Sequence, residues 1–349
     1  MRSIDRRLSK LLITADVGKE EVTVLAARKG PQGIQVVGKG AAPSLGIEGG
    51  EPVHPGDAAE QLLEAFEKAL PEAERRFGTL YLNFDDHRME SVCSRAFLSL
   101  KGEGEVRESD VREVCRLAER LVGNFEKRAL YAHPLRFLLD DRDVVANPVG
   151  IFGQKLEVWM HVLLVSSKRF EAWQRVSERA GFSNAHLVPS AWSTACGIFP
   201  KEERFRKRMV VDLGSDLLNL FVLAGGGIAE SRVLINDGMT VTRAVEAVSD
   251  AGKELFQRHS DAEEICVTGD LLPNEALVQG LREQFPLSVR EVSPVRVPEL
   301  QGPSFSALAG LLQVAGELDK ESFWRPFDGE GGIWNRVKQK AAAFIGEYF

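Results

Sequence analysis

Two similar hairpins, far apart in the chain, constrain its fold more than any other feature of the sequence. Each reads as a buried strand, a tight turn that carries Asp and Gly, and a second apolar strand; they cover residues 11–27 and 209–223. The repeat predicts two similar half-lobes that face each other. In nucleotide-binding folds such turns bring backbone N–H groups against phosphates and place an Asp near the metal. Two ordinary hairpins are the alternative, because Asp and Gly are common turn residues.

The composition argues against several classes of protein. The net charge of −7 disfavours nucleic acid as the main partner, because phosphate binding needs a basic face. No apolar run approaches the roughly 20 residues that span a bilayer. The cysteines are scattered without a CxxC pair, which indicates reduced thiols; they are Cys93, Cys115, Cys196 and Cys266. We therefore expect a cytoplasmic protein that forms two domains or one bilobed unit.

Changes of pattern along the chain predict its division into segments. The predicted segments are a first lobe in residues 1–78 and 166–205, an inserted α+β subdomain in 79–165, a second lobe in 206–322, a flexible linker in 323–332 and a helix in 333–349.

Local signals within these segments predict helix starts and one connection. Asp57 is expected to cap the first helix, and Ser109-Asp110 the helix of the insertion. In the second lobe the pattern predicts a helix over 240–248 and a separate segment over 253–260. The charged run 201–208 is interpreted as a solvated linker.

The last segment has the pattern of an amphipathic helix behind a glycine-rich tether. Apolar residues with aromatic edges share one face, and basic residues occupy the other positions, which is typical of an interfacial membrane anchor. A helix packed on its own domain is the alternative. The residues expected to contact the membrane are Ile333, Trp334, Arg336, Val337, Lys338, Lys340, Phe344, Ile345, Tyr348 and Phe349.

Taken together, these segments resemble the FtsA family of actin-like bacterial cell-division proteins. The resemblance covers nearly the whole chain and combines several separate motifs. They are the turn Asp16-Val17-Gly18, the loop in residues 37–50, the stretches 130–140 and 147–156 of the insertion, the turn Asp212-Leu213-Gly214, the turn Thr268-Gly269 and the helix in 333–349.

The resemblance implies an actin-like (ribonuclease H-like) bilobed α/β fold with an inserted, SHS2-like α+β subdomain and a truncated second-lobe subdomain. It implies a peripheral protein on the inner face of the cytoplasmic membrane, which binds an FtsZ-like protein, recruits other division proteins and associates with itself. ATP and magnesium would lie between the lobes. By analogy, the nucleotide-binding positions are Asp16, Gly18, Lys19, Asp212, Gly214, Ser215, Thr268 and Gly269.

The chain departs from the family pattern at each of these turns. Lys19 is followed by two glutamates where small hydroxyl residues are usual, and the second turn continues as Ser215-Asp216-Leu217-Leu218-Asn219. Asp216 would direct a negative charge toward the phosphates, and Leu217 and Leu218 cannot form hydrogen bonds with them. Asp270 replaces a glycine and crowds the approach to the backbone. The sequence therefore predicts weak or lost ATP binding and no active ATPase.

Two other functions stay open. A PilM-like adaptor of type IV pilus assembly would share the fold and the inserted subdomain, but is not expected to end in a tethered amphipathic helix. An ATP-dependent phosphotransferase of the same superfamily would need an intact phosphate cradle and a catalytic carboxylate. The departures at the turns disfavour the enzyme, and residues 333–349 favour the division adaptor over the pilus adaptor.

Overall fold

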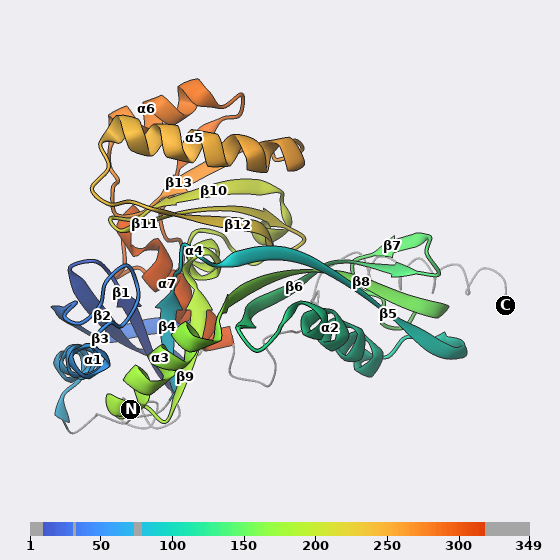
Figure 1. Ribbon diagram of the computed structural model, residues 1–349, viewed down its shortest axis with the longest axis horizontal. Coiled ribbons are helices and arrows are strands. Elements are labelled where there is room, and N and C mark those ends of the chain that lie inside the picture. Colours follow the sequence, from blue (N-terminus) through green and yellow to red (C-terminus); the bar gives the residue numbers. More distant parts are fainter. Residues whose placement is uncertain (1–9, 31–32, 73–78, 318–349) are drawn as a thin grey trace. The chain divides into compact units, whose positions relative to one another are not determined.

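The computed structural model of the protein describes residues 10–30, 33–72 and 79–317, whose strands form three sheets (Figure 1). The first is a five-stranded sheet in the order β3-β2-β1-β4-β9, in which β1, β2 and β3 are antiparallel and β4 and β9 join in parallel. Its strands are β1 (Lys10–Val17), β2 (Glu21–Gly30), β3 (Gly33–Pro43), β4 (Thr79–Phe84) and β9 (Asn184–Pro189).

The second sheet repeats this pattern of strands. Its order is β12-β11-β10-β13-β14, again with three antiparallel strands followed by two parallel ones. Its strands are β10 (Arg208–Leu213), β11 (Leu217–Ala224), β12 (Gly227–Ile235), β13 (Ile265–Thr268) and β14 (Val289–Glu291). The repeat of topology confirms the prediction of two similar half-lobes.

Helices cover both faces of the first sheet. One face packs on α1 (Pro55–Ala69) and α3 (Ser167–Arg179), where Phe66 and Trp173 are buried in the core. The opposite face packs on α7 (Ser306–Glu317) through Leu308, Leu311 and Leu312. Burial of these side chains stabilises the lobe by roughly 1.5–3 kcal/mol each.

The second sheet is covered in the same way. The helices α5 (Val241–Arg258) and α6 (Glu275–Gln284) pack on one face. On the other face, α4 (Ser190–Ile198) packs against Val210 and Phe221. Both faces of the strands are therefore buried, which is why β10 and β11 read as continuous apolar runs rather than as alternating ones.

The insertion is a separate four-stranded sheet with one helix. The sheet has the order β5-β8-β6-β7, and α2 (Glu108–Val122) packs on one of its faces through Val111, Val114 and Ala118. Its strands are β5 (Glu90–Glu105), β6 (Lys127–Leu139), β7 (Asp143–Val145) and β8 (Phe152–Ser166).

Two predicted helix starts were wrong by two or three positions. The helix α1 begins at Pro55 rather than after Asp57, because proline is favoured in the first turn, where no N–H donor is needed. The helix α2 begins at Glu108, and the carboxylate of Asp110 accepts a hydrogen bond from the N–H of Arg107 at 2.8 Å.

Three predicted boundaries also differ from the structure. The strand β4, predicted to open the insertion at residue 79, pairs with β1 and β9 of the first sheet because its residues are buried on both faces. The helix α7, predicted to belong to the second lobe, packs on the first sheet. In the second lobe, residues 241–258 form the single helix α5 rather than two segments.

The charged run 201–208 is a solvated linker only in part, because most of its residues are exposed but Arg204 and Arg208 are buried. Arg208 is the first residue of β10 and is 1% exposed; its guanidinium donates to Glu264 Oε1 at 2.8 Å and to the carbonyl of Glu203 at 2.7 Å. Arg204 is buried as well and donates to the carbonyl of Phe199 at 3.2 Å. Buried ion pairs and hydrogen bonds of this kind compensate for the desolvation of the charge.

Among the described residues, no helix is both long enough and apolar enough to cross a bilayer. The predicted linker 323–332 and the predicted amphipathic helix 333–349 lie outside the described residues.

The helices α4 and α7 approach each other at two glycines. A Cβ atom on Gly310 of α7 would lie 1.5 Å from the carbonyl oxygen of Ser193, and one on Gly197 of α4 would lie 2.1 Å from the carbonyl oxygen of Ser306. These contacts involve backbone atoms on both sides, so a side chain at either position forces the helices apart.

Gly310→Ala is therefore expected to lower the free energy of unfolding by at least about 2 kcal/mol, as overpacking of rigid backbone does. Chemical denaturation monitored by circular dichroism measures this change. Gly316→Ala on the same helix is the matched control, because its Cβ would meet side-chain atoms and no backbone; the nearest is the tip of Ile34 at 3.0 Å. Equal unfolding midpoints for the two variants would contradict this account of the crossing.

Candidate functional site

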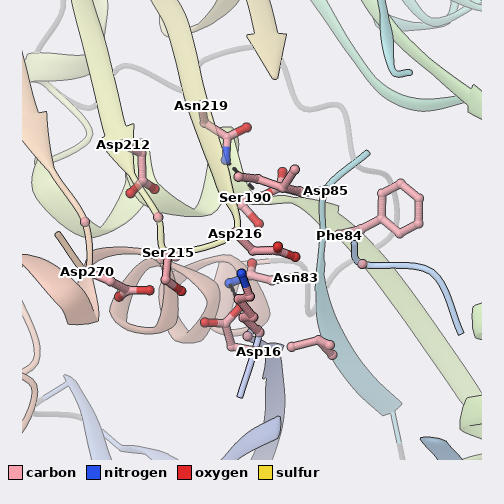
Figure 2. Close-up of a pocket in the computed structure, with 18 of the residues that line it drawn as sticks. Asp16, Asn83, Phe84, Asp85, Ser190, Asp212, Ser215, Asp216, Asn219 and Asp270 are labelled. Carbon is pink, nitrogen blue, oxygen red and sulfur yellow. Dashed lines mark hydrogen bonds between the residues drawn. The ribbon is translucent and has the colours of Figure 1, made fainter. Parts of the chain in front are cut away.

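A cleft lies where the two predicted turns meet, at the ends of the central strands of both sheets (Figure 2). Asp16 lies in β1, one residue before the end of the strand. Asp212 lies in β10, where it pairs with Asn219 of the antiparallel strand β11 and with Thr268 of the parallel strand β13. The ends of neighbouring parallel strands form the usual ligand crevice of α/β folds. The sequence-predicted residues that the cleft brings together are Asp16, Gly18, Lys19, Asp212, Gly214, Ser215 and Gly269.

Thr268 does not line the cleft. Its side chain is fully buried, and its hydroxyl lies 3.1 Å from the carbonyl of Pro303 and 2.7 Å from Ser306 Oγ. Leu218 also points away, into the core beneath α5 and α6, whereas Leu217 lines the cleft. Thr268 therefore joins β13 to the start of α7 rather than contacting a ligand.

Several residues of the cleft were not predicted from the sequence. Asn83 and Asp85 come from the end of β4, Ser190 from the start of α4, and Asn219 from β11. Their position in the sequence could have identified three of them. Asn83, Asp85 and Ser190 lie at the carboxyl ends of parallel strands, where ligand crevices form. The assignment of β4 to the insertion hid two of them.

Hydrogen bonds tie the carboxylates of the two turns to the helix α4. Asn83 Nδ2 donates to Asp16 Oδ1 at 3.1 Å, and Ser193 Oγ donates to Asn83 Oδ1 at 2.7 Å. On the other side, Thr194 Oγ1 donates to Asp212 Oδ2 at 2.6 Å. We call these five residues the polar seam. It links the first turn and the second turn to consecutive residues of α4.

A further hydrogen bond crosses the cleft directly. Asn219 Nδ2 of the second sheet donates to Asp85 Oδ2, which follows β4 of the first sheet, at 2.8 Å (Figure 2). The hydroxyl of Ser190 also donates to the carboxylate of Asp85. Asp85 is thus held by both lobes, which closes this side of the cleft.

The second turn already holds a carboxylate. The carboxylate of Asp270, which follows Gly269, faces the second turn, and hydrogen bonds from the N–H and the hydroxyl of Ser215 lower the pKa of this carboxyl against the effect of burial. Gly269 has a φ of +111°, and a Cβ there would lie 2.5 Å from the N of Leu213, so only glycine fits. Asn236 Nδ2 donates to the carbonyl of Gly214 at 3.0 Å and fixes the turn from behind.

The cleft is strongly acidic. Of the described residues that line it, five carry carboxylates, and the one cation is the exposed Lys19. Burial raises the pKa of Asp16 to about 6 and those of Asp85 and Asp212 to about 7, against hydrogen bonds from Asn83, Asn219 and Thr194 that lower them. Burial likewise raises the pKa of Asp270.

These features fit a triphosphate poorly. A phosphate needs N–H donors and positive charge, but the N–H of Gly18 donates to the carbonyl of Glu21 at 2.9 Å and the N–H of Ser215 donates to Asp270. The cavity measures about 100 Å³, below the roughly 300–1,000 Å³ of typical small-molecule sites. Within the described residues, no group of three or more Asp, Glu, His or Cys side chains is arranged to hold a metal ion.

Both the insertion and most of the chain are similar in sequence to known proteins. The family profile described as "SHS2 domain inserted in FTSA" matches residues 87–164. The cell division protein FtsA of Escherichia coli K12 is 23% identical over 280 residues, which cover 77% of this chain and 64% of that relative. FtsA of Pseudomonas aeruginosa is 22% identical over 342 residues, which cover 91% of this chain and 82% of the relative.

The chain is FtsA-like. Among solved structures, a PilM–PilN type IV pilus biogenesis complex superposes with a TM-score of 0.58 and 16% identity, covering 87% of this chain and 98% of that chain. The fold is actin-like, with an SHS2 subdomain inserted in the first lobe, as the sequence predicted. The chain spans 64% of the length of the first curated FtsA relatives that it matches.

The profile match also agrees with the sheet topology. It begins at residue 87, just after β4, and ends at residue 164, two residues before the end of β8. The FtsA-like insertion is therefore a distinct four-stranded unit that is connected to the first sheet through the end of β4 and the start of α3. It also contacts the second sheet, because the N–H of Ile228 donates to Tyr131 Oη and the N–H of Ser231 donates to Ser91 Oγ, both at 3.0 Å. Between β12 and β13 of the second lobe, the chain holds the single helix α5.

The raised pKa of Asp212 predicts a pH dependence of stability. The folded protein holds a proton on this carboxyl that the unfolded chain releases, so its contribution is fully present below about pH 4 and is lost as the pH rises through about 7. Asp212→Asn removes this loss. The free energy of unfolding of the variant is therefore expected to exceed that of the wild type by on the order of 2–4 kcal/mol above pH 7, and by little below pH 4.

The readout is the difference in unfolding free energy between variant and wild type from pH 4 to 8. Burial lowers the pKa of His133 to about 4 and that of His161 to about 3, so the protein loses their contribution to its stability as the pH falls. This loss masks the effect of Asp212 in the wild type alone, and the difference between variant and wild type removes it. Asp250→Asn, at an exposed position of α5, is the control and should show no such slope. A slope for Asp212→Asn no larger than that of the control would overturn the assignment.

Proposed function

We propose that this protein is a membrane-tethered, actin-like adaptor of the FtsA type. In this role it links an FtsZ-type cytoskeletal protein and other division proteins to the inner face of the cytoplasmic membrane. The observation that carries the proposal is the SHS2 match over residues 87–164, set in an actin-like pair of lobes that align with Pseudomonas aeruginosa FtsA over 91% of the chain.

The tether in this proposal is the amphipathic helix predicted in residues 333–349. Its apolar face and its basic residues fit an interfacial helix, and a single helix of this kind binds reversibly. The protein would then be cytoplasmic and peripheral, with the SHS2 subdomain as the surface for later division proteins. Self-association on the membrane belongs to the same proposal, and nucleic acid does not.

We further propose that the adaptor works with weak or lost ATP binding and without ATP turnover. The carboxylate of Asp270 takes the N–H and hydroxyl of Ser215 that a phosphate would use. The acidic lining would also repel a triphosphate, since like charges at close range are unfavourable. The bridge between Asp85 and Asn219 supports a cleft that stays closed without nucleotide.

A PilM-like role in type IV pilus assembly is the second candidate. The similarity to the PilM–PilN complex structure, which covers 98% of that chain with a TM-score of 0.58, favours it. The curated relatives, in contrast, are FtsA proteins.

Vesicle sedimentation tests the adaptor directly. With the full chain present, FtsZ that carries its C-terminal tail is expected to sediment with anionic vesicles, and FtsZ without the tail is not. Phe344→Glu, on the predicted apolar face, should abolish recruitment, because a buried charge opposes interfacial binding. Gln339→Glu adds the same charge to the polar face and should retain most of it.

Recruitment of FtsZ that is unchanged by Phe344→Glu would refute the tether. Absence of recruitment by the wild type, together with binding of a pilus inner-membrane protein, would support the PilM-like role instead.

A further inference from the structure

The insertion covers the first half of strand β12. This strand is the outermost one of the second sheet, and such an edge presents backbone groups that no further strand pairs with. Here the insertion supplies the acceptors: the N–H of Ile228 donates to Tyr131 Oη of β6, and the N–H of Ser231 donates to Ser91 Oγ of β5, both at 3.0 Å. Two strands that the chain connects to the first lobe therefore bind the edge of the second lobe.

The turn between β11 and β12 fits closely against the insertion. A Cβ atom on Gly227 would lie 2.3 Å from the ring of His133 on β6, and the Nε2–H of His133 donates to the carbonyl of Gly225 at 3.1 Å. Gly227 does not have a positive φ, so the approach of the His133 ring, and not the backbone conformation, requires glycine at this position. The glycine run 225–227 thus lets β6 contact the turn directly.

Apolar side chains close the same contact. Tyr131 and Leu163 of the insertion lie in one buried cluster with Phe221 and Leu223 of β11. Separation of the insertion from the hairpin would expose part of this cluster to water, which is unfavourable. We call this contact the latch; it consists of Ser91, Tyr131, His133 and residues 225–231.

The other end of the β11–β12 hairpin is held at the cleft. Asn219 of β11 donates to Asp85 at 2.8 Å, and Asp85 lies in the segment that leads from β4 into the insertion. The carboxylate of the next residue, Asp86, lies 2.5 Å from Arg169 Nη1 in the first turn of α3, which joins the entry of the insertion to its exit. The hairpin is therefore fixed twice, at its turn by the insertion and near its open end by the entry segment of the insertion.

We propose that the latch couples the insertion to the cleft, so that the cleft opens only when the insertion releases the β11–β12 hairpin. The insertion is part of the first lobe and the hairpin is part of the second sheet. A motion that separates the two sheets therefore also pulls the N–H groups of Ile228 and Ser231 from their acceptors, and each buried N–H that loses its acceptor opposes the motion. Because coupling between two sites is reciprocal, release of the latch must in turn favour the open cleft.

The latch would regulate the subdomain on which the proposed adaptor docks its partners, and this one consequence rests on the proposed function. A division protein that binds the insertion in its released position would shift the population toward the open cleft. The latch itself is a property of the chain alone, so its tests need neither vesicles nor a division protein. Their failure would leave the proposed function intact.

The first test releases the latch and measures opening of the cleft. Leu217 lines the cleft and is 9% exposed, so Leu217→Cys is the probe, in the full-length protein with Cys93→Ser to remove the exposed native thiol. The rate at which a maleimide labels Leu217→Cys is expected to rise at least about ten-fold when Ser91→Ala/Tyr131→Phe is added, because two N–H groups then lose their acceptors.

Two controls show whether this effect belongs to the latch. Ser94→Ala removes a hydroxyl from the same strand, but one that donates to the carbonyl of Ala118 within the insertion at 2.6 Å, and it should leave the labelling rate unchanged. The buried thiols of Cys115 and Cys266 report unfolding of the insertion and of the second sheet, and should not be labelled faster. Labelling of Leu217→Cys that stays at the original rate, or that accelerates together with these thiols or equally in Ser94→Ala, would overturn the latch.

The second test breaks the contact across the cleft and measures release of the latch. Asp85→Ala removes the acceptor of Asn219 from the side of the first lobe and leaves β12 untouched. The amides of Ile228 and Ser231 are then expected to exchange with deuterium at least about ten-fold faster, as NMR of the full-length protein measures. Asp85→Asn is the matched control, because its side-chain oxygen can still accept from Asn219.

Either of two results of the second test would overturn the proposal. Unchanged exchange in Asp85→Ala would mean that the cleft opens without release of the latch. Equal acceleration by Asp85→Asn would assign the effect to the lost charge rather than to the lost contact.

Discussion

The close crossing of α4 and α7 is the contact on which the arrangement of the two lobes depends. Gly197 and Gly310 let the two helix backbones meet without intervening side chains. The helix α7 packs on the first sheet and α4 on the second, so this one crossing sets the distance between the sheets. The positions of the two Asp-Gly turns, and therefore of the cleft between them, follow from it.

The polar seam depends on the same crossing. Ser193 and Thr194 are consecutive on α4, so their side chains leave the helix in different directions, one toward Asn83 and Asp16 and the other toward Asp212. The buried carboxylates are costly in their charged form, which is why burial raises the pKa values of Asp16 and Asp212. The fold thus keeps the two Asp-Gly turns facing each other across the cleft, while the chain's own side chains use the polar groups there.

Much of this architecture could be predicted from the sequence, because it depends on local patterns. The two hairpins, the helix α3 that ends before Gly181 and the insertion all have clear apolar periods or turn residues. The predictions that were wrong concern elements whose structure depends on contacts between residues far apart in the chain. The assignment of β4 to the first sheet depends on pairing with β9, and the burial of Arg208 depends on Glu264; neither partner is near in the chain.

The residues of the cleft show the same difference between local patterns, which could be predicted, and distant contacts, which could not. The residues of the repeated turns were found because they lie in a recognisable pattern, whereas Asn83, Asp85 and Asn219 come from strand ends with no motif. Asp270 was identified as an obstacle to nucleotide, but its hydrogen bonds from Ser215 could not be predicted, since they need the two turns to meet. Residues 333–349 carry the predicted tether and lie outside the described residues.

The chain's own carboxylates occupy the cleft, and its own hydrogen bonds close it. Isothermal titration of the full-length protein with Mg-ATP tests this closure most directly. The account predicts no saturable binding up to about 1 mM nucleotide, and a measurable gain in affinity for Asp270→Gly, which frees the Ser215 N–H and hydroxyl. Binding of Mg-ATP by the wild type with a micromolar dissociation constant would contradict it.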